Sequence, residues 1–141
     1  MNNSPVRSVV VDGGNLQANG TFAQCYRCDG IVVMQGQCSL TLDGYHTGEL
    51  VGVGDPAAQA RQAIDNIETL MQAAGGELAD VVKIVVYVTD RRFRNSVYGV
   101  INERFPEPRP CSTGLVVSGL ALEELLVEID AWGFIPDDGA Q

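Results

Sequence analysis

The segment DVVKIVVYVTD (80–90) constrains the fold most strongly because it is apolar on both of its sides. Successive side chains of a strand point to opposite faces of a sheet. The even-numbered positions from Val82 to Val88 are all aliphatic, and the odd-numbered positions from Val81 to Tyr87 are apolar except for Lys83. A strand with this pattern is buried from both sides. We therefore expect it in the interior of a sheet whose two faces are both covered.

An amphipathic helix is predicted directly before this strand, over residues 55–76. Asp55 is a suitable N-cap, Pro56 suits the first helical position, and a pair of glycines ends the segment. The apolar stripe of this helix consists of Ala60, Ile64, Ile67, Met71 and Ala74. On the polar face, Arg61 is expected to pair with Asp65, four residues further on.

A second helix is predicted directly after the strand, over residues 91–105, and three prolines end it. Its inward-facing residues are Phe93, Val97, Val100, Ile101 and Phe105. Further strands are expected at 7–12, at 21–42 as a hairpin turning at Asp29-Gly30, and in the segments 112–121 and 125–135.

The order of these elements predicts an α+β fold, a mixed sheet with two helices on one face. Two helices cannot cover both faces of the sheet, so we expect other copies of the chain to cover the second face. The length of 141 residues predicts a single domain, residues 1–141, with its core over residues 7–136.

Composition narrows the function. The net charge is −9, from 9 basic and 18 acidic residues, and this argues against nucleic-acid binding. No apolar run is long enough for a membrane span, and the start of the chain lacks the pattern of a signal peptide, so a cytoplasmic protein is expected.

The four cysteines are expected to be free thiols, and the CxxC pair at 25–28 lies within a predicted strand, where its side chains diverge. The single histidine, His46, gives no metal-ligand cluster.

Three segments carry a family resemblance: GDPAAQARQAIDNIETLMQAAGGELADVVKIVVYVTD (54–90), FPEPRP (105–110) and LVEIDA (126–131). Over residues 15–136 the chain resembles the reactive-intermediate deaminase family, also called Rid or YjgF-like and historically L-PSP endoribonuclease-like. The resemblance implies a chorismate mutase-like fold, a homotrimer, and small-molecule clefts at the subunit interfaces. It also implies hydrolysis of reactive enamines or imines to ketoacids and ammonia, without a metal or an organic cofactor.

The candidate site residues follow from the same resemblance. The family turn commonly reads R-P-A-R-S, and its second arginine binds the substrate carboxylate, but here Ser112 stands at that position. Other positions also differ: Phe22 replaces a phenol, Gly114 a cysteine and Tyr98 an asparagine. Glu128 is the catalytic candidate, and the substrate-binding candidates are Ser112, Thr113, Gly36, Phe22, Gln24 and Tyr98.

Each assignment has a structural alternative. Glu128 is expected either to hold water for acid–base catalysis or to be a solvated strand residue. The hydroxyls of Ser112 and Thr113 either line the cleft or satisfy backbone groups at the strand start. A serine cannot replace the charge of an arginine, although Arg109 or one of Arg91, Arg92 and Arg94 could supply a cation.

Two functions therefore remain open at this point. One is a Rid-like hydrolase acting on enamines, imines or related small molecules. The other is a non-catalytic small-molecule-binding or stress-protective trimer of the same fold. A ribonuclease activity rests on the historical family name alone, and the acidic charge and the single histidine argue against it.

Overall fold

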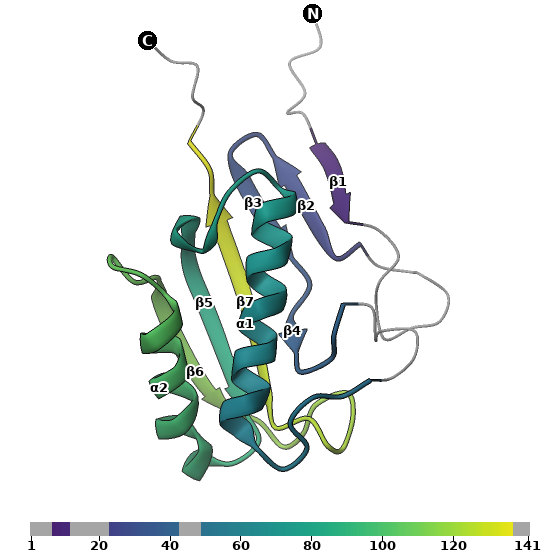
Figure 1. The fold of residues 1–141 in the computed structure, drawn as a ribbon, viewed down its shortest axis with the longest axis vertical. Helices are drawn as coiled ribbons and strands as arrows, with labels where there is room; N and C mark the ends of the chain where they lie inside the picture. The colour runs from purple at the N-terminus through teal and green to yellow at the C-terminus, as the bar shows by residue number, and fades with distance from the viewer. Residues whose placement is uncertain (1–6, 12–22, 43–48, 137–141) are drawn as a thin grey trace, which may run out of the picture.

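A computed structural model describes residues 7–11, 23–42 and 49–136, with backbone alone for 7–11. The strands are β1 (Arg7–Val11), β2 (Cys25–Cys28), β3 (Ile31–Met34), β4 (Gln37–Cys38), β5 (Val81–Val88), β6 (Cys111–Val116) and β7 (Val127–Phe134). The helices are α1 (Pro56–Ala73) and α2 (Arg94–Arg104), with short 3-10 turns at Leu78–Asp80 and Arg91–Phe93. Figure 1 shows their arrangement.

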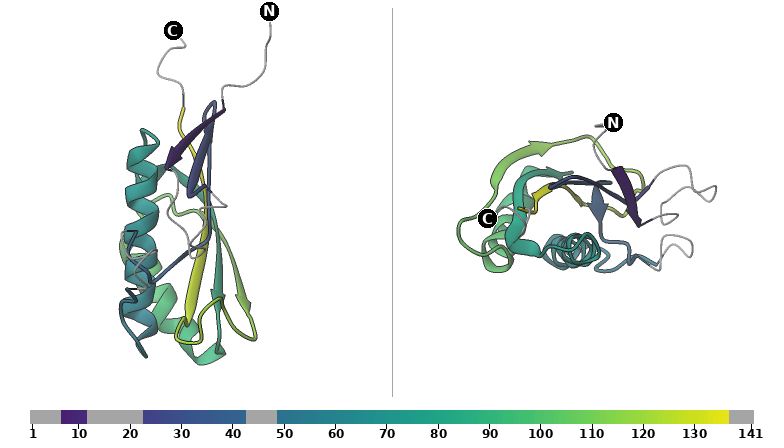
Figure 2. Two further views of the ribbon diagram at one scale, coloured as in Figure 1. Left: turned by 90° about the vertical axis from the view of Figure 1, so that its right-hand side faces the viewer. Right: turned by 90° about the horizontal axis from the view of Figure 1, so that it is seen from above.

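The strands form one mixed sheet in the order β1-β2-β3-β7-β5-β6, and β4 pairs with β7. β5 and β6 pair in parallel, and the other pairs are antiparallel. Both helices lie on the same face of this sheet, and no helix of the described residues lies on the opposite face (Figure 2). The expected α+β architecture is therefore confirmed, and β5 is an interior strand as predicted.

The predicted apolar stripe of α1 is buried against the sheet. Ala60, Ile64, Ile67 and Met71 are fully buried, and Ala74 nearly so. The side chain of Asp55 accepts a hydrogen bond from the backbone N–H of Ala58 at 3.0 Å, which confirms the N-cap. These features explain why the sequence forms a helix here and which side of it faces the strands.

The predicted pairing of Arg61 with Asp65 is wrong. Arg61 instead forms an ion pair with Glu103 of α2 at 2.7 Å, and Arg104 of α2 contacts Asp65 at 2.6 Å. The two helices lie side by side (Figure 1), so their long polar side chains reach across to each other. Arg61 thus pairs with a residue of the neighbouring helix and not with the residue one turn further along its own helix.

β5 departs from simple alternation at its first residues. Val81, Ile84, Val86 and Val88 are buried, whereas Val82 is 51% exposed. The register with β7 shifts between Val81 and Lys83, which is the signature of a β-bulge. The prediction that Val82 shares the face of the later even-numbered residues was therefore wrong, because the bulge moves Val81 into that role.

The hairpin predicted at Asp29-Gly30 is present between β2 and β3, although its strands are shorter than the predicted segment. Asp29 adopts a positive φ of 51° in the turn. A Cβ atom at Gly30 would lie 2.6 Å from the carbonyl oxygen of Ile135, so the close approach of β7's end requires glycine.

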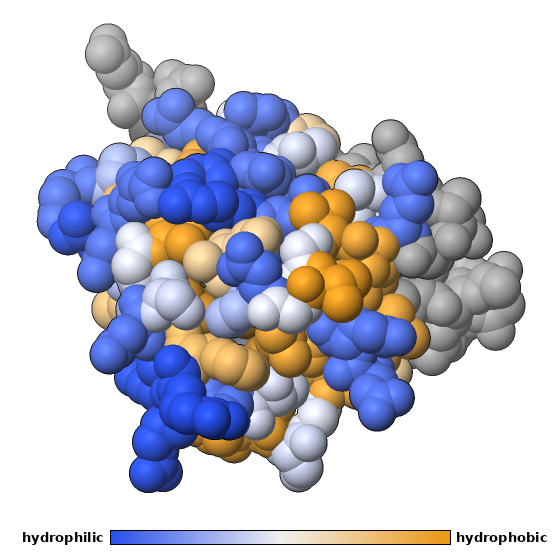
Figure 3. All heavy atoms as spheres, turned by 60° about the horizontal axis from the view of Figure 1, so that its bottom comes forward, coloured by the Kyte–Doolittle hydropathy of each residue, from blue (hydrophilic) through white to orange (hydrophobic). Residues whose placement is uncertain are grey.

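The helix-free face of the sheet, here called the open face, carries large apolar side chains. Alternation from the buried residues of each strand places Ile31, Val33, Val82, Leu115 and Phe134 there, all exposed. By contrast, the lower end of the molecule shows hydrophobic areas broken up by hydrophilic ones (Figure 3). The open face therefore exposes apolar side chains in a way that needs an explanation.

Two amides of α1 are buried although they lie outside its apolar stripe. Asn66 donates from Nδ2 to the carbonyl oxygens of Cys38 at 3.2 Å and of Leu40 at 2.7 Å. Gln59 donates to the carbonyl oxygen of Glu124 at 2.9 Å and accepts from the backbone N–H of Leu126 at 2.8 Å. These amides attach α1 to the segments that lead out of β4 and into β7.

Replacement of Asn66 by alanine should lower the free energy of unfolding by about 2–4 kcal/mol, because two buried carbonyl oxygens lose their donor. Gln72→Ala, at an exposed position of the same helix, should change it by less than about 0.5 kcal/mol. Urea unfolding at one fixed protein concentration measures both. Equal effects of the two substitutions would show that Asn66 does not hold α1 to this edge.

Candidate functional site

Glu128 lies on the open face, beside Asp130 and beneath Gly36. The two carboxylates are two residues apart on β7, so they share one face of the strand. A Cβ atom at Gly36 would lie 2.7 Å from Oδ1 of Asp130 and 3.0 Å from Oε2 of Glu128. Because glycine has no Cβ atom, the backbone between β3 and β4 approaches these carboxylates closely, and a larger residue would have to displace them.

The surroundings of Glu128 favour its protonated form. Burial raises the pKa of the Glu128 carboxyl, and the negative charge of Asp130 raises that pKa further. Tyr87, the partner of Glu128 in the register of β5 and β7, donates its hydroxyl to Oδ2 of Asp130 at 2.9 Å. That hydrogen bond, followed by burial, raises the pKa of Tyr87. A carboxyl group whose pKa is raised towards neutrality suits acid–base chemistry.

Ser112 and Thr113 lie on opposite sides of the edge strand β6. The hydroxyls of Ser112 and Tyr98 are 2.9 Å apart, on the side of α2. Thr113 accepts a hydrogen bond from Nζ of Lys83 at 2.7 Å, on the open face. Neighbouring residues of a strand point in opposite directions, so one chain does not bring these two hydroxyls into one surface.

Ser112 and three neighbouring residues form a group on the α2 side of β6. The guanidinium of Arg94 lies 5.0 Å from the ring centroid of Tyr98. A Cβ atom at Gly114 would overlap Nη1 of Arg94 and lie 2.6 Å from the Tyr98 hydroxyl. We call Arg94, Tyr98, Ser112 and Gly114 the edge cluster.

Gln24 is completely buried, and its Oε1 accepts a hydrogen bond from Nε2 of Gln37 at 3.1 Å. Its own Nε2 has no hydrogen-bond partner among the described residues. Phe22, the other candidate from this part of the chain, lies outside the described residues.

The structure thus separates the candidates into two groups within one chain. Glu128 and Gly36 lie on the open face, whereas Ser112 and Tyr98 lie on the helix side of the edge strand. The two groups therefore lie on opposite faces of the sheet. A single cleft that contains both groups therefore requires more than one copy of the chain.

Asp130 and Tyr87 were not among the candidates from the sequence, and Arg94 was only one of four cations considered. Asp130 was detectable because it lies two positions after Glu128 on a predicted strand. Arg94 lies four positions before Tyr98 on a helix, which places the two side chains together. Tyr87 required the register of β5 against β7, which no local pattern supplies.

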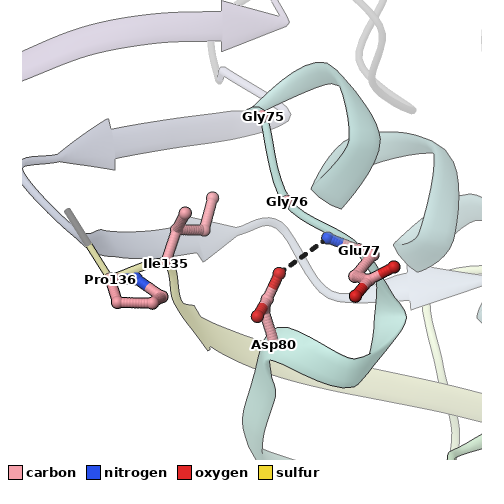
Figure 4. A pocket seen from close by; sticks show the side chains of 6 residues that line it. All are labelled: Gly75, Gly76, Glu77, Asp80, Ile135 and Pro136. Carbon is pink, nitrogen blue, oxygen red and sulfur yellow. Dashed lines mark hydrogen bonds between the residues drawn. The ribbon is translucent and has the colours of Figure 1, made fainter. Parts of the chain in front are cut away.

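A pocket of about 320 Å³ lies elsewhere, at the end of α1 (Figure 4). Its walls comprise Gly75, Gly76, Glu77, Asp80, Ile135 and Pro136, and none of the candidate residues. Glu77 and Asp80 each accept a hydrogen bond from the other's backbone N–H, so their carboxylates serve the turn before β5. We assign this pocket a structural role.

Among the described residues, the thiols and the remaining acidic groups form no further candidate catalytic or metal-binding centre. None of the four cysteines, all within the described residues, forms a disulfide, and burial raises the pKa of Cys25 to about 11, which disfavours its thiolate. Within the described ranges, no three His, Cys, Asp or Glu side chains gather as a metal site. None of the helices described is both long and apolar enough to cross a membrane.

Comparison with known proteins identifies the family. A family model described as Endoribonuclease L-PSP matches residues 13–135. A RutC family protein of Pyrococcus horikoshii is 33% identical over 112 residues, which make up 79% of this chain and 85% of that protein. The chain therefore belongs to the L-PSP endoribonuclease family, also known as the Rid or YjgF family.

Solved structures agree with this assignment. A member of the YjgF family from Mycobacterium tuberculosis is 31% identical, with a TM-score of 0.78 over 92% of this chain and 100% of that chain. RidA from an Antarctic Psychrobacter is 30% identical, with a TM-score of 0.78 over 91% of this chain and 99% of that chain. The expected YjgF-like fold is confirmed.

Replacement of Asp130 by asparagine should lower the pKa of Glu128 while leaving it above its ordinary value. The substitution removes the neighbouring negative charge, but the burial that contributes most to the shift remains. A carbon-13 NMR titration of the Glu128 carboxyl measures the change. An unchanged or higher pKa in the variant would show that the two carboxylates do not interact.

Proposed function

We propose that this protein is a Rid-like hydrolase that acts on a reactive enamine or imine of a small molecule and releases ammonia. The observation that carries the proposal is the Glu128 carboxyl, whose pKa is raised and which lies beside Asp130 and beneath Gly36. Membership of the Rid family supports the proposal but does not fix the reaction, because one fold hosts several functions.

Hydrolysis of an imine needs no redox partner. Water adds its oxygen to the imine carbon, one of its protons goes to the nitrogen, and the C=N double bond becomes a single bond. Loss of ammonia from this intermediate forms the carbonyl, so the balance is one imine plus one water to one carbonyl compound plus ammonia. In this proposal Glu128 accepts the proton of the attacking water and returns it to the nitrogen.

The surroundings of Glu128 suit both of these tasks. A carboxyl group with a raised pKa is a stronger base when ionised, and it holds its proton to a higher pH than an ordinary carboxyl group. Asp130 keeps that pKa raised and is itself held by Tyr87. Gly36 lets the backbone lie directly against the two carboxylates, since a Cβ atom there would be 2.7 Å from Oδ1 of Asp130 and 3.0 Å from Oε2 of Glu128.

We propose that the cleft forms in a homotrimer, between the open face of one subunit and the edge cluster of the next. The support is physical: the open face exposes five large apolar side chains, and the two groups of candidate residues lie on opposite sides of one sheet. We further propose that residues 7–136 form the single functional domain, that the protein acts in the cytoplasm, and that neither nucleic acid nor membrane is its partner.

One observation favours a second candidate function, a non-catalytic small-molecule-binding or stress-protective trimer. Ser112 stands where the family resemblance places the carboxylate-binding arginine, and its hydroxyl already contacts that of Tyr98. A chain without a cation at this point would bind carboxylate substrates weakly. The two functions differ in whether ammonia is released faster than in the absence of protein.

Replacement of Glu128 by glutamine should lower imine hydrolysis by about 100- to 10,000-fold, because glutamine keeps the shape but cannot exchange the proton. Ammonia release from the imine of pyruvate, generated in the assay by an amino-acid oxidase that oxidises alanine with O2, measures the rate. Light scattering on the same preparation should give about three chain masses for both proteins. The control is Glu123→Gln, the same change at an exposed position before β7.

The same variant should be at least as stable as the wild type at neutral pH. A raised pKa in the folded state means that folding favours the protonated Glu128, so ionisation destabilises the fold as the pH rises through that pKa. Glutamine removes this loss. Unchanged ammonia release in Glu128→Gln, with the trimer intact, would exclude Glu128 from the mechanism, and a monomeric wild type would exclude the shared cleft.

A further inference from the structure

We propose that the edge cluster is an anion-binding subsite in which Arg94 binds the carboxylate of the small molecule, in place of an arginine at position 112. The inference rests on the proposed function only in treating this carboxylate as part of the substrate. The site itself is argued from the contacts of Arg94, Tyr98, Ser112 and Gly114.

Arg94 is held in position by the ring of Tyr98. It is the first residue of α2, and Tyr98 follows one helical turn later, so the guanidinium lies over the ring at 5.0 Å from its centroid. A stacked guanidinium keeps its N–H groups at the periphery of the plane, where they remain able to donate. The stacking thus restricts the cation without using its donors.

Arg94 also differs from most other arginines of the described residues in its electrostatic surroundings. Four of them form ion pairs with carboxylates, and these are Arg61, Arg92, Arg104 and Arg109. Arg94 has no carboxylate within salt-bridge distance in the described part of the chain. Its charge is therefore available to a ligand, in a protein whose net charge is −9.

The absence of a side chain at Gly114 gives Arg94 and Tyr98 their place over β6. A Cβ atom there would overlap Nη1 of Arg94 and lie 2.6 Å from the hydroxyl of Tyr98. Gly114 lies two residues after Ser112 on β6, so both face the side of α2. The guanidinium therefore reaches the strand near Ser112 from the helix above it.

The hydroxyls of the cluster complete the donor set. Those of Tyr98 and Ser112 are 2.9 Å apart, and either can donate to the other. Whichever does so, the other hydroxyl keeps its hydrogen for a ligand. The cluster thus presents a planar cation and one neutral O–H donor on the same side of the edge strand.

A small carboxylate fits this donor set best. The two oxygens of a carboxylate match the parallel N–H groups of a guanidinium, and such pairs are shorter and stronger than neutral hydrogen bonds. The hydroxyl donor adds a third contact to the same carboxylate or to the oxygen next to it, as in a 2-oxo acid. The subsite is therefore expected to prefer pyruvate to its uncharged amide, pyruvamide.

Binding of pyruvate, followed by isothermal titration calorimetry, tests this subsite. Arg94→Gln should weaken binding about 10- to 100-fold, the loss expected for a charge-assisted contact. Arg91→Gln removes the same charge from an exposed residue three positions earlier and should weaken binding less than about two-fold. Pyruvamide should bind weakly to all three proteins. Gly114→Ala should weaken pyruvate binding without unfolding the protein, because it displaces flexible side-chain ends.

Three results would overturn the subsite: no pyruvate binding by the wild type, equal binding by Arg94→Gln, or equal losses in Arg91→Gln and Arg94→Gln. The last would indicate a general positive field at the start of α2.

The proposed hydrolase is judged separately, by ammonia release. Pyruvate binding that depends on Arg94, without ammonia release, would contradict the hydrolase and support the subsite. Ammonia release from the imine of pyruvate at the same rate in the wild type and in Arg94→Gln would support the hydrolase and contradict the subsite.

Discussion

The packing of two helices on one face of the sheet determines where the polar groups of this protein lie. On β7, the side chains of Val127, Ile129 and Ala131 are buried beneath the helices. The residues between them therefore point to the open face, because successive side chains of a strand alternate. Glu128 and Asp130 are therefore directed together to the side that has no helix. The same alternation sends Tyr87 of β5 to that side, where it donates to Asp130.

An open face with partly buried carboxylates and exposed apolar side chains is an unusual surface for an isolated chain. A second copy that covers it would remove the apolar groups from water and increase the desolvation of Glu128. Covering would thus strengthen the effect that already raises the pKa of this residue. The edge cluster, on the other side of the sheet, would complete the site of a neighbouring copy rather than its own.

Local patterns in the sequence predicted the parts of the fold that depend on local chemistry. The cap at Asp55, the apolar stripe of α1 and the turn at Asp29 were all correct, because each follows from the nearest residues. The prediction that Val82 shares the face of Ile84 and the later even-numbered residues failed, because a bulge is set by the register between two strands. The predicted ion pair of Arg61 with Asp65 was wrong because the actual partner, Glu103, is 42 residues away in the sequence.

The candidate site shows the same division. Glu128 and Gly36 were selected from the family resemblance, and the structure brings them together, although their roles stay a prediction. Ser112 and Thr113 were expected to line one cleft, whereas strand alternation places them on opposite sides of β6. Arg94 was one of several cations that could replace the missing arginine, and only the parallel pairing of β5 and β6 beneath α2 singles it out.

A subunit-mixing experiment tests most directly the central claim that each site is built from two copies of the chain. At substrate concentrations well below the dissociation constant, Glu128→Gln and Arg94→Gln homotrimers are each expected to keep at most about a tenth of the wild-type rate. In trimers reassembled from equal amounts of the two, about one quarter of the clefts would combine an intact Glu128 with an intact Arg94 from the neighbouring subunit. Ammonia release from the imine of pyruvate should therefore return to about one quarter of the wild-type rate. No recovery in verified mixed trimers would contradict the shared cleft.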